Sequence, residues 1–171
     1  DAVLAQIERE KISMIPGPPT IYQSLLAHPR RKEYDLSSLR LAVTGAAPVP
    51  VELVRQMREE LGFEVVVTAY GLTETCGVVS ICRADDSAER ISHSSGRAMD
   101  GTEIQCVDKE GQSVAAGIDG EIWVRGFNVM RHYFNNGDAT AEALTRDGWL
   151  KTGDVGVMDE DGYVRITGRI K

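Results

Sequence analysis

The stretch Tyr70–Thr75, YGLTET, places an aromatic ring, a glycine, two hydroxyls and a carboxylate shortly after the β-branched run Val65–Val67. In an open α/β sheet, ligands collect beyond the carboxyl ends of the strands. Tyr70 could pack on a base there, Thr73 could donate to a phosphate oxygen, and Glu74 could hold Mg²⁺. An ordinary helix N-terminus, capped by Thr73 and with Glu74 facing the dipole, explains the same letters equally well. Spacing alone leaves both interpretations open.

Three further stretches have side chains or bare backbone of a kind that binds nucleotides. Thr44–Pro50, TGAAPVP, leaves a strand through small residues against which a flat ligand can lie, although most loop glycines serve the turn. Asp154, within Trp149–Gly156, can accept both hydroxyls of a ribose, although Gly-Asp is also common turn chemistry. Arg169, within Gly168–Lys171, can reach a ribose or a phosphate, or simply end a solvated strand. None of these stretches is decisive alone.

The elements that must position these stretches change in kind along the chain. Up to about residue 82, helical patterns alternate with short apolar runs, which predicts an α/β arrangement with a largely parallel sheet flanked by helices. The expected helices cover about residues 1–10, the segment around Ile21 and Leu25, and Val54–Leu61. The expected strands are Ile12–Ile15, Leu39–Val43, Glu64–Thr68 and Val78–Ile81.

After about residue 96, short strands separated by acidic-glycine turns predict a small antiparallel β-barrel-like subdomain. The polar segment 83–95 is interpreted as a linker, so the predicted division is 1–95 for the α/β part and 96–171 for the β-rich part. One helix, Ala139–Leu144, interrupts the strands, with Asp138 as its expected N-cap. The expected strands are Glu103–Val107, Glu121–Val124, Val155–Met158 and Tyr163–Thr167.

Composition excludes several classes of protein. The 171 residues are 42% apolar and 26% charged with a net charge of −7, which is ordinary for a soluble domain and unlike a broad nucleic-acid or anionic-membrane surface. No apolar run approaches the ~18 residues of a membrane span. Cys76, Cys82 and Cys106 have no metal or disulfide spacing, so we expect reduced thiols and a cytoplasmic protein. The chain begins without Met and ends straight after a strand, so we expect a piece of a longer protein.

Motifs of other enzyme classes are absent. The chain has no Walker-type phosphate loop, no Rossmann glycine fingerprint, no H-E-x-x-H zinc motif and no G-x-S-x-G nucleophile elbow. The three histidines, His28, His93 and His132, have no ligand partner at useful spacing, so we expect them on the solvated surface.

Taken in order, the four stretches resemble the adenylate-forming superfamily: acyl-CoA synthetases, nonribosomal peptide synthetase adenylation domains and firefly-type luciferases. YGLTET resembles its Y-G-x-T-E motif, WLKTGD its ribose-binding T-G-D motif, and GRIK the G-R-x-K run at its domain hinge. Gly120–Gly126 and the FNVMRHYFNN after it resemble a further motif, in which His132 replaces the usual glycine before Tyr133. That departure is expected to lie outside the nucleotide contacts. The resemblance covers nearly the whole chain and looks strongest to actinobacterial-type fatty-acid or steroid side-chain acyl-CoA ligases.

The resemblance implies a role for each motif residue. Tyr70 would pack on the adenine, Thr73 would bind the α-phosphate of ATP or AMP, and Glu74 would ligate Mg²⁺, which makes Thr73 and Glu74 the implied catalytic pair. Asp154 and Arg169 would contact the ribose. Also implied are an adenine wall of Gly45, Ala46 and Ala47, a nucleotide contact at Gly71, a hinge at Lys171, and an acyl pocket near Cys76, Gly77 and Val78.

The family's reaction has two steps, so the implied function is an ATP-dependent acyl-CoA synthetase. A carboxylic acid is activated as acyl-AMP with release of pyrophosphate, and the acyl group then passes to coenzyme A. The phosphate loop of the family is expected before residue 1, and the C-terminal domain with the adenylation lysine after Lys171. We therefore expect the isolated chain to be inactive, to bind AMP weakly, and to self-associate through exposed sheet edges.

Two alternatives remain open. One is an amino-acid-activating or luciferase-like member of the same superfamily, which substrate screening would separate. The other is a non-catalytic nucleotide-binding module, which the sequence upstream of Asp1 would test. The acid itself cannot be read from the chain, because one methylene changes discrimination by only ~1–3 kcal/mol.

Overall fold

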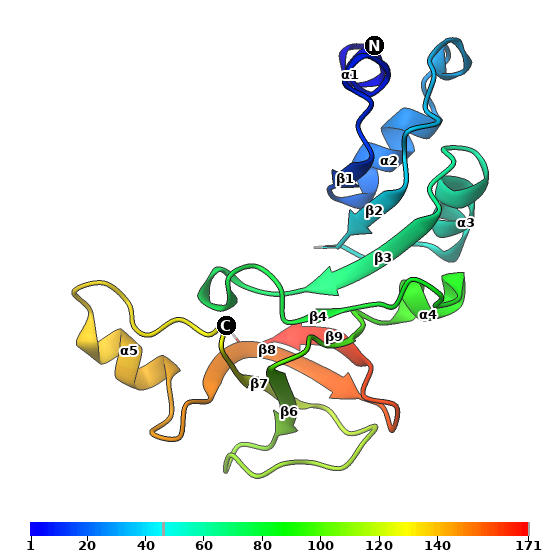
Figure 1. Cartoon of the computed structure of the whole chain (residues 1–171). Coiled ribbons are helices and arrows are strands. Elements are labelled where there is room, and N and C mark those ends of the chain that lie inside the picture. The colour runs from blue at the N-terminus through cyan, green and yellow to red at the C-terminus, as the bar shows by residue number, and fades with distance from the viewer. Residues whose placement is uncertain (46, 171) are drawn as a thin grey trace. The chain divides into compact units, whose positions relative to one another are not determined.

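The computed structural model describes residues 1–45 and 47–170, which form two compact units (Figure 1). The first unit comprises Asp1–Ala69 and Cys82–His93, and the second comprises Tyr70–Ile81 and the residues from Ser94 onward. The segment that carries YGLTET therefore belongs with the second unit. The predicted ranges 1–95 and 96–171 describe a change of sequence pattern and stay a prediction.

The first unit contains the parallel strands β1, β2 and β3, with β2 in the middle. Met14 pairs with Leu41 and Pro16 with Val43, and in the same ascending order β2 pairs with Val65–Thr68 of β3, so all three strands run in one direction. This confirms the predicted α/β arrangement. The element bounds are α1 Ala2–Glu10, β1 Met14–Pro16, α2 Pro19–Leu26, the 3₁₀ turn η1 Arg31–Glu33, β2 Leu41–Thr44, α3 Val51–Glu59, β3 Val65–Tyr70 and α4 Ala88–His93.

Apolar side chains at helical spacing explain how α3 packs. Leu53, Val54 and Met57 are buried along one side of the helix, and Pro50 precedes it with the extended backbone that suits a helix start. Three consecutive residues of β3, Val66 to Thr68, are buried, as in a strand covered on both faces. The sequence thus forms a hydrophobic core between helices and sheet in this unit.

Tyr22 ties the carboxyl ends of two strands together. Its side chain is fully buried, and its ring packs edge-on against Phe63 with the ring centres 5.9 Å apart. The hydroxyl donates to the carbonyl oxygens of Ile15, at 2.7 Å, and Val43, at 3.2 Å. Burial raises the pKa of this phenol to about 12. Tyr22 therefore holds β1 and β2 where the TGAAPVP stretch begins.

The interpretation of residues 83–95 as a polar linker is wrong. They contain α4, whose Ala88 and Ile91 are buried in the first unit. Ser92 Oγ donates to the Val49 carbonyl at 2.6 Å, and Arg58 Nη2 donates to the Asp86 carbonyl at 3.0 Å. A helix of two turns needs only two buried apolar residues, which is too short a pattern to separate from a polar loop.

The second unit has an antiparallel sheet in the order β6-β7-β8-β9. Antiparallel pairing is as predicted, but over the described residues the sheet stays open between β6 and β9, so the barrel-like closure is not supported. Turn and strand spacing specifies pairing of neighbours, whereas closure depends on tilt and shear, which the pattern does not encode. The bounds are the 3₁₀ turn η2 Thr73–Thr75, β4 Ser80–Ile81, β5 Arg97–Ala98, β6 Thr102–Val107, β7 Gly120–Gly126, α5 Gly137–Ala143, β8 Leu150–Met158 and β9 Val164–Arg169.

The core of the second unit joins its two chain segments. Val79, which lies before β4, is fully buried together with Ile122, Val124 and Val164 of the later sheet. The predicted N-cap of the helix near residue 139 is wrong: α5 is capped by Asn136, whose side-chain oxygen accepts from the Ala139 N–H at 3.1 Å.

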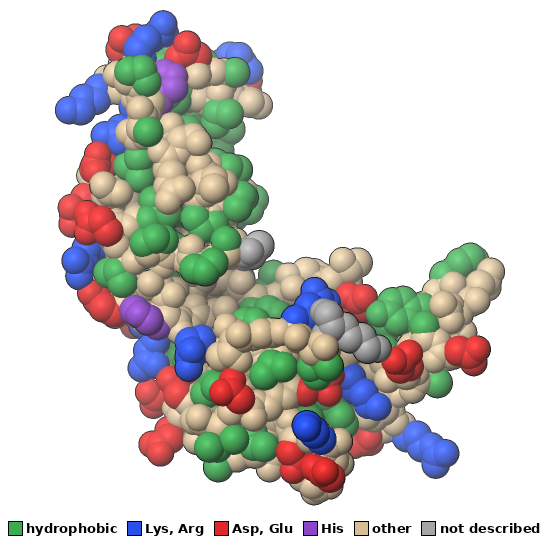
Figure 2. Space-filling model, turned by 180° about the vertical axis from the view of Figure 1, so that it is seen from behind, with side chains coloured by type: hydrophobic (Ala, Val, Ile, Leu, Met, Phe, Trp, Pro, Cys, Tyr) green, Lys and Arg blue, Asp and Glu red, His purple; other side chains and the backbone are tan. Residues whose placement is uncertain are grey.

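Acidic and basic side chains are interspersed on the face shown in Figure 2.

Among the residues that the structure describes, no helix is long and apolar enough to cross a membrane.

Candidate functional site

Asp154 lies in a bulge of β8, not in a turn before a strand. Trp123 pairs with Lys151 and Glu121 with Val155, so residues 152–154 of β8 all lie opposite Ile122. Extra residues on one strand bend it and redirect its side chains. The alternative of a turn aspartate is therefore wrong, because one strand, Leu150–Met158, runs through the whole WLKTGD stretch.

Hydrogen bonds fix the conformation of this bulge. Thr152 Oγ1 donates to the Ile122 carbonyl at 2.7 Å and accepts from the Asp154 N–H at 3.1 Å. Gly153 has a φ of 72°, which a glycine adopts without steric cost. Its N–H donates to Glu121 Oε1 at 3.0 Å. The threonine and the glycine of T-G-D thus have structural tasks that place the aspartate.

Glu121 supports the bulge from β7. Its Oε1 accepts from Gly153, and its Oε2 accepts from the Trp123 indole N–H at 2.9 Å. Both carboxylate oxygens are therefore engaged on one side of the bulge. Sequence reasoning recognised the G-E-I-W run but did not connect its glutamate with T-G-D.

The Asp154 carboxylate meets two other predicted site residues. Tyr70 Oη donates to Asp154 Oδ2 at 2.7 Å, and Arg169 Nε lies 3.4 Å from Asp154 Oδ1. Only 11% of the aspartate side chain is exposed, against 65% of the arginine side chain. Burial, and to a smaller extent the neighbouring carboxylate, raises the pKa of Tyr70 above its ordinary value. The structure thus brings Tyr70, Asp154 and Arg169 together in the second unit.

Tyr70 has a contact that the sequence did not suggest. Its predicted role is to pack its ring on a base, and the structure shows that its hydroxyl is bonded to the aspartate. The two roles use different parts of the side chain, so they are compatible. The stacking role stays a prediction.

The loop after β3 folds tightly back on itself. A Cβ on Gly71 would lie 2.2 Å from the Gly77 carbonyl oxygen, so the backbone approach requires glycine at position 71. Gly77 has a φ of 96°, and Cys76 before it has a φ of 54°. The backbone conformation of the loop therefore explains why glycine stands at positions 71 and 77. The predicted nucleotide contact of Gly71 and acyl contact of Gly77 stay predictions.

The alternative of a capped α-helix at YGLTET is wrong. Thr73–Thr75 forms one 3₁₀ turn, which Cys76 ends in the left-handed conformation. Leu72 is the N-cap residue, and Thr75 closes the turn: its buried Oγ1 accepts from the Leu72 N–H at 3.0 Å and donates to the Leu72 carbonyl at 2.9 Å. The Thr73 side chain is exposed and bonds to no described residue, so it is not a cap.

Glu74 is held by the segment that follows β7. Its carbonyl accepts from the Met130 N–H at 2.7 Å, and its Oε1 accepts from Tyr133 Oη at 2.8 Å. That bond raises the pKa of Tyr133. The residue next to the unusual His132 thus contacts the predicted Mg²⁺ ligand, so this segment belongs to the candidate site.

Asn128 is a further site residue that sequence reasoning missed. Its side chain is buried, and its Nδ2 donates to the carbonyls of Val78, at 2.8 Å, and Thr75, at 3.3 Å. Its Oδ1 accepts from Thr102 Oγ1 at 3.2 Å. A buried asparagine between apolar neighbours in FNVM was the available signal, because such a side chain needs several partners.

The predicted acyl-pocket residues lie on the same loop. Cys76 and Gly77 are exposed, and Val78 is half-buried. Around them the loop is closed by backbone hydrogen bonds, among them those from the N–H groups of Cys76 and Gly77 to the carbonyls of Thr73 and Leu72. Their role toward an acyl group stays a prediction.

The remaining predicted site residues lie elsewhere. Gly45 and Ala47 belong to the first unit, and Ala46 and Lys171 lie outside the described residues. A Cβ on Gly45 would come within 2.8 Å of the Ala69 carbonyl oxygen, so the close approach of the two strand ends requires glycine. The adenine contact of Gly45 and Ala47 stays a prediction.

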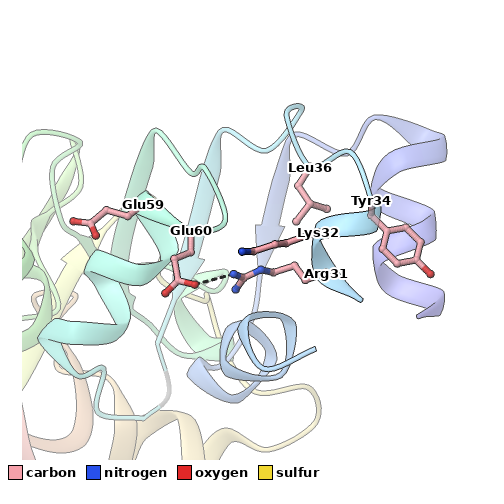
Figure 3. A pocket seen from close by; sticks show the side chains of 6 residues that line it. All are labelled: Arg31, Lys32, Tyr34, Leu36, Glu59 and Glu60. Carbon is pink, nitrogen blue, oxygen red and sulfur yellow. Dashed lines mark hydrogen bonds and ion pairs between the residues drawn. The ribbon is translucent and has the colours of Figure 1, made fainter. Parts of the chain in front are cut away.

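A shallow pocket of about 380 Å³ lies in the first unit (Figure 3). Within it, Arg31 Nη2 donates to Glu60 Oε2 at 2.8 Å and Nη1 donates to the Leu26 carbonyl at 3.0 Å. The guanidinium is thus already bonded within the unit. The lining residues are Arg31, Lys32, Tyr34, Leu36, Glu59 and Glu60, none of them a predicted site residue.

The described residues form no metal site built from several protein ligands. Across residues 1–45 and 47–170, no three His, Cys, Asp or Glu side chains gather as a metal site. Mg²⁺ usually binds one or two carboxylates and completes its shell with waters and phosphate oxygens, so the predicted role of Glu74 does not require such a cluster. That role stays a prediction. His93 and His132 are exposed. His28 is half-buried, and its Nε2 lies 3.0 Å from Asp1 Oδ1.

Residues 1–134 match the family described as AMP-binding enzyme. The chain is 51% identical over 168 residues to a 7a-methyl-1,5-dioxo-octahydro-1H-inden-4-yl propanoyl:CoA ligase of Mycobacterium tuberculosis, covering 98% of this chain and 31% of that relative. Two of the similar solved structures illustrate the fold. Amide bond synthetase McbA from Marinactinospora thermotolerans shares 36% identity with a TM-score of 0.87, over 99% of this chain and 34% of that one. The O-succinylbenzoate coenzyme A synthetase MenE of Bacillus subtilis, in complex with ATP and magnesium ion, shares 35% identity with a TM-score of 0.85, over 98% and 33%.

An α/β unit followed by an antiparallel sheet that positions the T-G-D aspartate is the architecture of an adenylate-forming enzyme. The chain belongs to the AMP-binding enzyme family. It spans about a third of the length of the relatives it matches.

Proposed function

We propose that the protein containing this chain is an AMP-forming acyl-CoA ligase, and that the chain contributes the ribose, metal and part of the adenine contacts. The observation that carries the proposal is the buried Asp154 carboxylate, placed by a bulge and bonded to Tyr70 of the YGLTET motif at 2.7 Å. Two motifs that lie 84 residues apart in sequence thus meet in one unit. The 51% identity to a propanoyl:CoA ligase supports the same class of reaction.

The described residues have separate tasks in this proposal. Asp154 accepts the two ribose hydroxyls, and Arg169 contacts the same side of the nucleotide. Thr73, whose exposed hydroxyl has no described partner, donates to the α-phosphate. Positioned donors of this kind stabilise charge that develops in a transition state. Attack of the substrate carboxylate on the α-phosphate displaces pyrophosphate and gives acyl-AMP.

Glu74 holds Mg²⁺ in this proposal through a carboxylate that the protein has already oriented. When bound, the ion supplies positive charge that neutralises the phosphate oxygens. The chain contributes position rather than covalent chemistry, as is general for transfer at phosphorus. Coenzyme A then attacks the acyl carbon, and AMP leaves.

The substrate in this proposal is an aliphatic or alicyclic carboxylic acid. The loop Cys76–Val78 offers no charged side chain that would hold a substrate amino group. The relative from Mycobacterium tuberculosis is named for a propanoyl group on a bicyclic dione, which is an acid of this class. Cys76, Cys82 and Cys106 form no disulfide among the described residues, which supports a cytoplasmic location.

An acyl-CoA ligase assay with the full-length protein tests this function. We expect AMP release that requires ATP, Mg²⁺, coenzyme A and an aliphatic or alicyclic acid together. Medium-chain fatty acids, a bicyclic propanoic acid, an aromatic acid and amino acids form a suitable panel. Turnover restricted to amino acids would overturn the substrate class, and no AMP release with any acid would overturn the function.

A second candidate is an amide bond synthetase, favoured by the similarity to McbA. Such an enzyme shares the adenylation step but passes the acyl group to an amine. Replacing coenzyme A by an amine in the same assay separates the two. The proposed function predicts that coenzyme A, and not the amine, accelerates AMP release.

The isolated chain is expected to give no ATP–pyrophosphate exchange and to bind AMP weakly. We expect it to self-associate, because β1 is an edge strand with an exposed Met14 and the unit also exposes Val3 and Ile21. Figure 2 shows hydrophobic side chains gathered on one face of this unit. Clear pyrophosphate exchange by the chain alone would contradict the expected inactivity. A monomer in analytical ultracentrifugation would contradict the expected self-association.

A further inference from the structure

The segment Asn128–Tyr133 fastens the loop Leu72–Val78 at separate points. The Asn128 side chain binds two loop carbonyls, the Met130 N–H binds the Glu74 carbonyl, and Tyr133 Oη binds the Glu74 carboxylate. The first two contacts hold the loop backbone. Only the contact of Tyr133 acts on the functional group of a predicted site residue.

The bond from Tyr133 leaves one carboxylate oxygen for other partners. Oε1 of Glu74 accepts from the phenol at 2.8 Å, and no described residue donates to Oε2. A carboxylate has lone pairs on both oxygens, so the phenol occupies one side of the group. The free oxygen is then directed by the position of the bonded one.

Tyr133 is itself held in place. Its N–H donates to Thr140 Oγ1 at 3.0 Å, and that hydroxyl donates to the Asn136 carbonyl at 2.8 Å. Thr140 lies in α5, so the tyrosine backbone is anchored on a helix rather than on a free loop. Because the backbone of Tyr133 is fixed, its side chain has less conformational freedom to lose when the phenol bonds to Glu74.

We propose that Tyr133 is a positioning residue, which orients Glu74 so that this carboxylate ligates the magnesium ion through one oxygen. This inference rests on the proposed function, because it takes Glu74 as the protein ligand of the metal. Hydrogen-bonded partners of metal-binding carboxylates set their orientation, and their loss typically weakens metal affinity ~10–100-fold. Since Glu74 is half-buried and water can replace the phenol, the lower end of that range applies.

The test compares Tyr133→Phe with the wild type in the full-length protein. Manganese binding is measured by electron paramagnetic resonance with a non-hydrolysable ATP analogue, and the magnesium dependence of AMP release is measured beside it. We expect the metal dissociation constant to rise about tenfold, while kcat at saturating magnesium stays within about threefold. The matched control is Tyr34→Phe, which removes an exposed phenol hydroxyl bonded to Arg30 in the first unit and should change neither quantity.

The outcomes separate the inference from the proposed function. A metal affinity unchanged by Tyr133→Phe would overturn the role of Tyr133. An equal loss in the Glu74→Gln background would also overturn it, because the phenol would then act independently of the carboxylate. Absence of metal–nucleotide binding by the wild type would instead overturn the proposed function. Tyr133→His, which keeps a ring donor, is expected to restore part of the affinity and keeps the test valid where the Phe variant folds poorly.

Discussion

Asn128→Ala is expected to loosen the YGLTET loop selectively. The side chain is 7% exposed and makes three hydrogen bonds, to the carbonyls of Thr75 and Val78 and from Thr102 Oγ1. Truncation leaves two carbonyls and a hydroxyl without this partner in a buried position. The loop amides of Cys76 and Gly77, which donate to Thr73 and Leu72, report on its opening.

The magnitude follows from those bonds. Each is worth about 0.5–1.5 kcal/mol net, and the 3.3 Å contact lies at the weak end. The sum is about 2–3 kcal/mol, which corresponds to roughly 30- to 150-fold in an equilibrium constant. Because the remaining bond from Met130 to the Glu74 carbonyl stays intact, we assign the loss to local opening rather than to global unfolding.

Hydrogen exchange followed by mass spectrometry measures this opening in the full-length protein. We expect the peptide covering residues 70–81 to exchange about 30- to 150-fold faster in Asn128→Ala. Thr102→Val, which removes one of the three bonds, should give a smaller acceleration, and Lys109→Ala in an exposed turn none. Exchange within threefold of the wild type would refute the argument that Asn128 holds the loop.

Variants at three other positions, Asp154, Glu121 and Tyr22, test the remaining parts of the structure. Asp154→Asn should raise the Michaelis constant for ATP about 10-fold or more by steady-state kinetics, because a hydrogen bond to a charged group is worth about 1.5–3 kcal/mol; an unchanged constant would remove Asp154 from the ribose site. Glu121→Ala should lower the melting temperature and raise the same constant, whereas Glu121→Gln should recover one of its two bonds and fall between them; equal behaviour of the two variants would argue against its support of Gly153. Burial raises the pKa of Tyr22 from 10.0 to about 12, so the folded state holds its proton more tightly and the first unit should lose stability as the pH rises from 10 through 12. Urea denaturation at pH 9 and pH 11.5 checks this, and a Tyr22→Phe variant with the same loss between those values would contradict it.

The sequence predicted the elements that repeat a clear pattern. The parallel strands follow from apolar runs separated by helices, and the antiparallel strands follow from acidic-glycine turns. Boundaries moved where a strand continues through residues of low strand propensity. Leu150–Met158 is the largest case: Gly153 and Asp154 look like a turn, but bonds from their N–H groups to the side chains of Glu121 and Thr152 keep them in the sheet.

The sequence identified the motif residues of the site but not the residues that hold them in place. Tyr70, Glu74, Asp154 and Arg169 stand in recognisable strings, and the structure shows contacts among three of them. The residues that hold them contribute through tertiary contacts at 50 or more residues of separation, as Asn128 and Tyr133 do. Sequence patterns cannot reveal these contacts, because a pattern relates only residues that lie close together along the chain.

The chain passes between its two units more than once, after Ala69, Ile81 and His93. A single proteolytic cut therefore cannot release the second unit intact. A fragment that starts at residue 94 would lack Val79, a fully buried member of its core, together with the loop that carries Thr73 and Glu74. The antiparallel sheet consequently completes its core with a segment that precedes α4 in the chain. A peptide of residues 70–81 added in trans should therefore help a fragment that starts at residue 94 to fold.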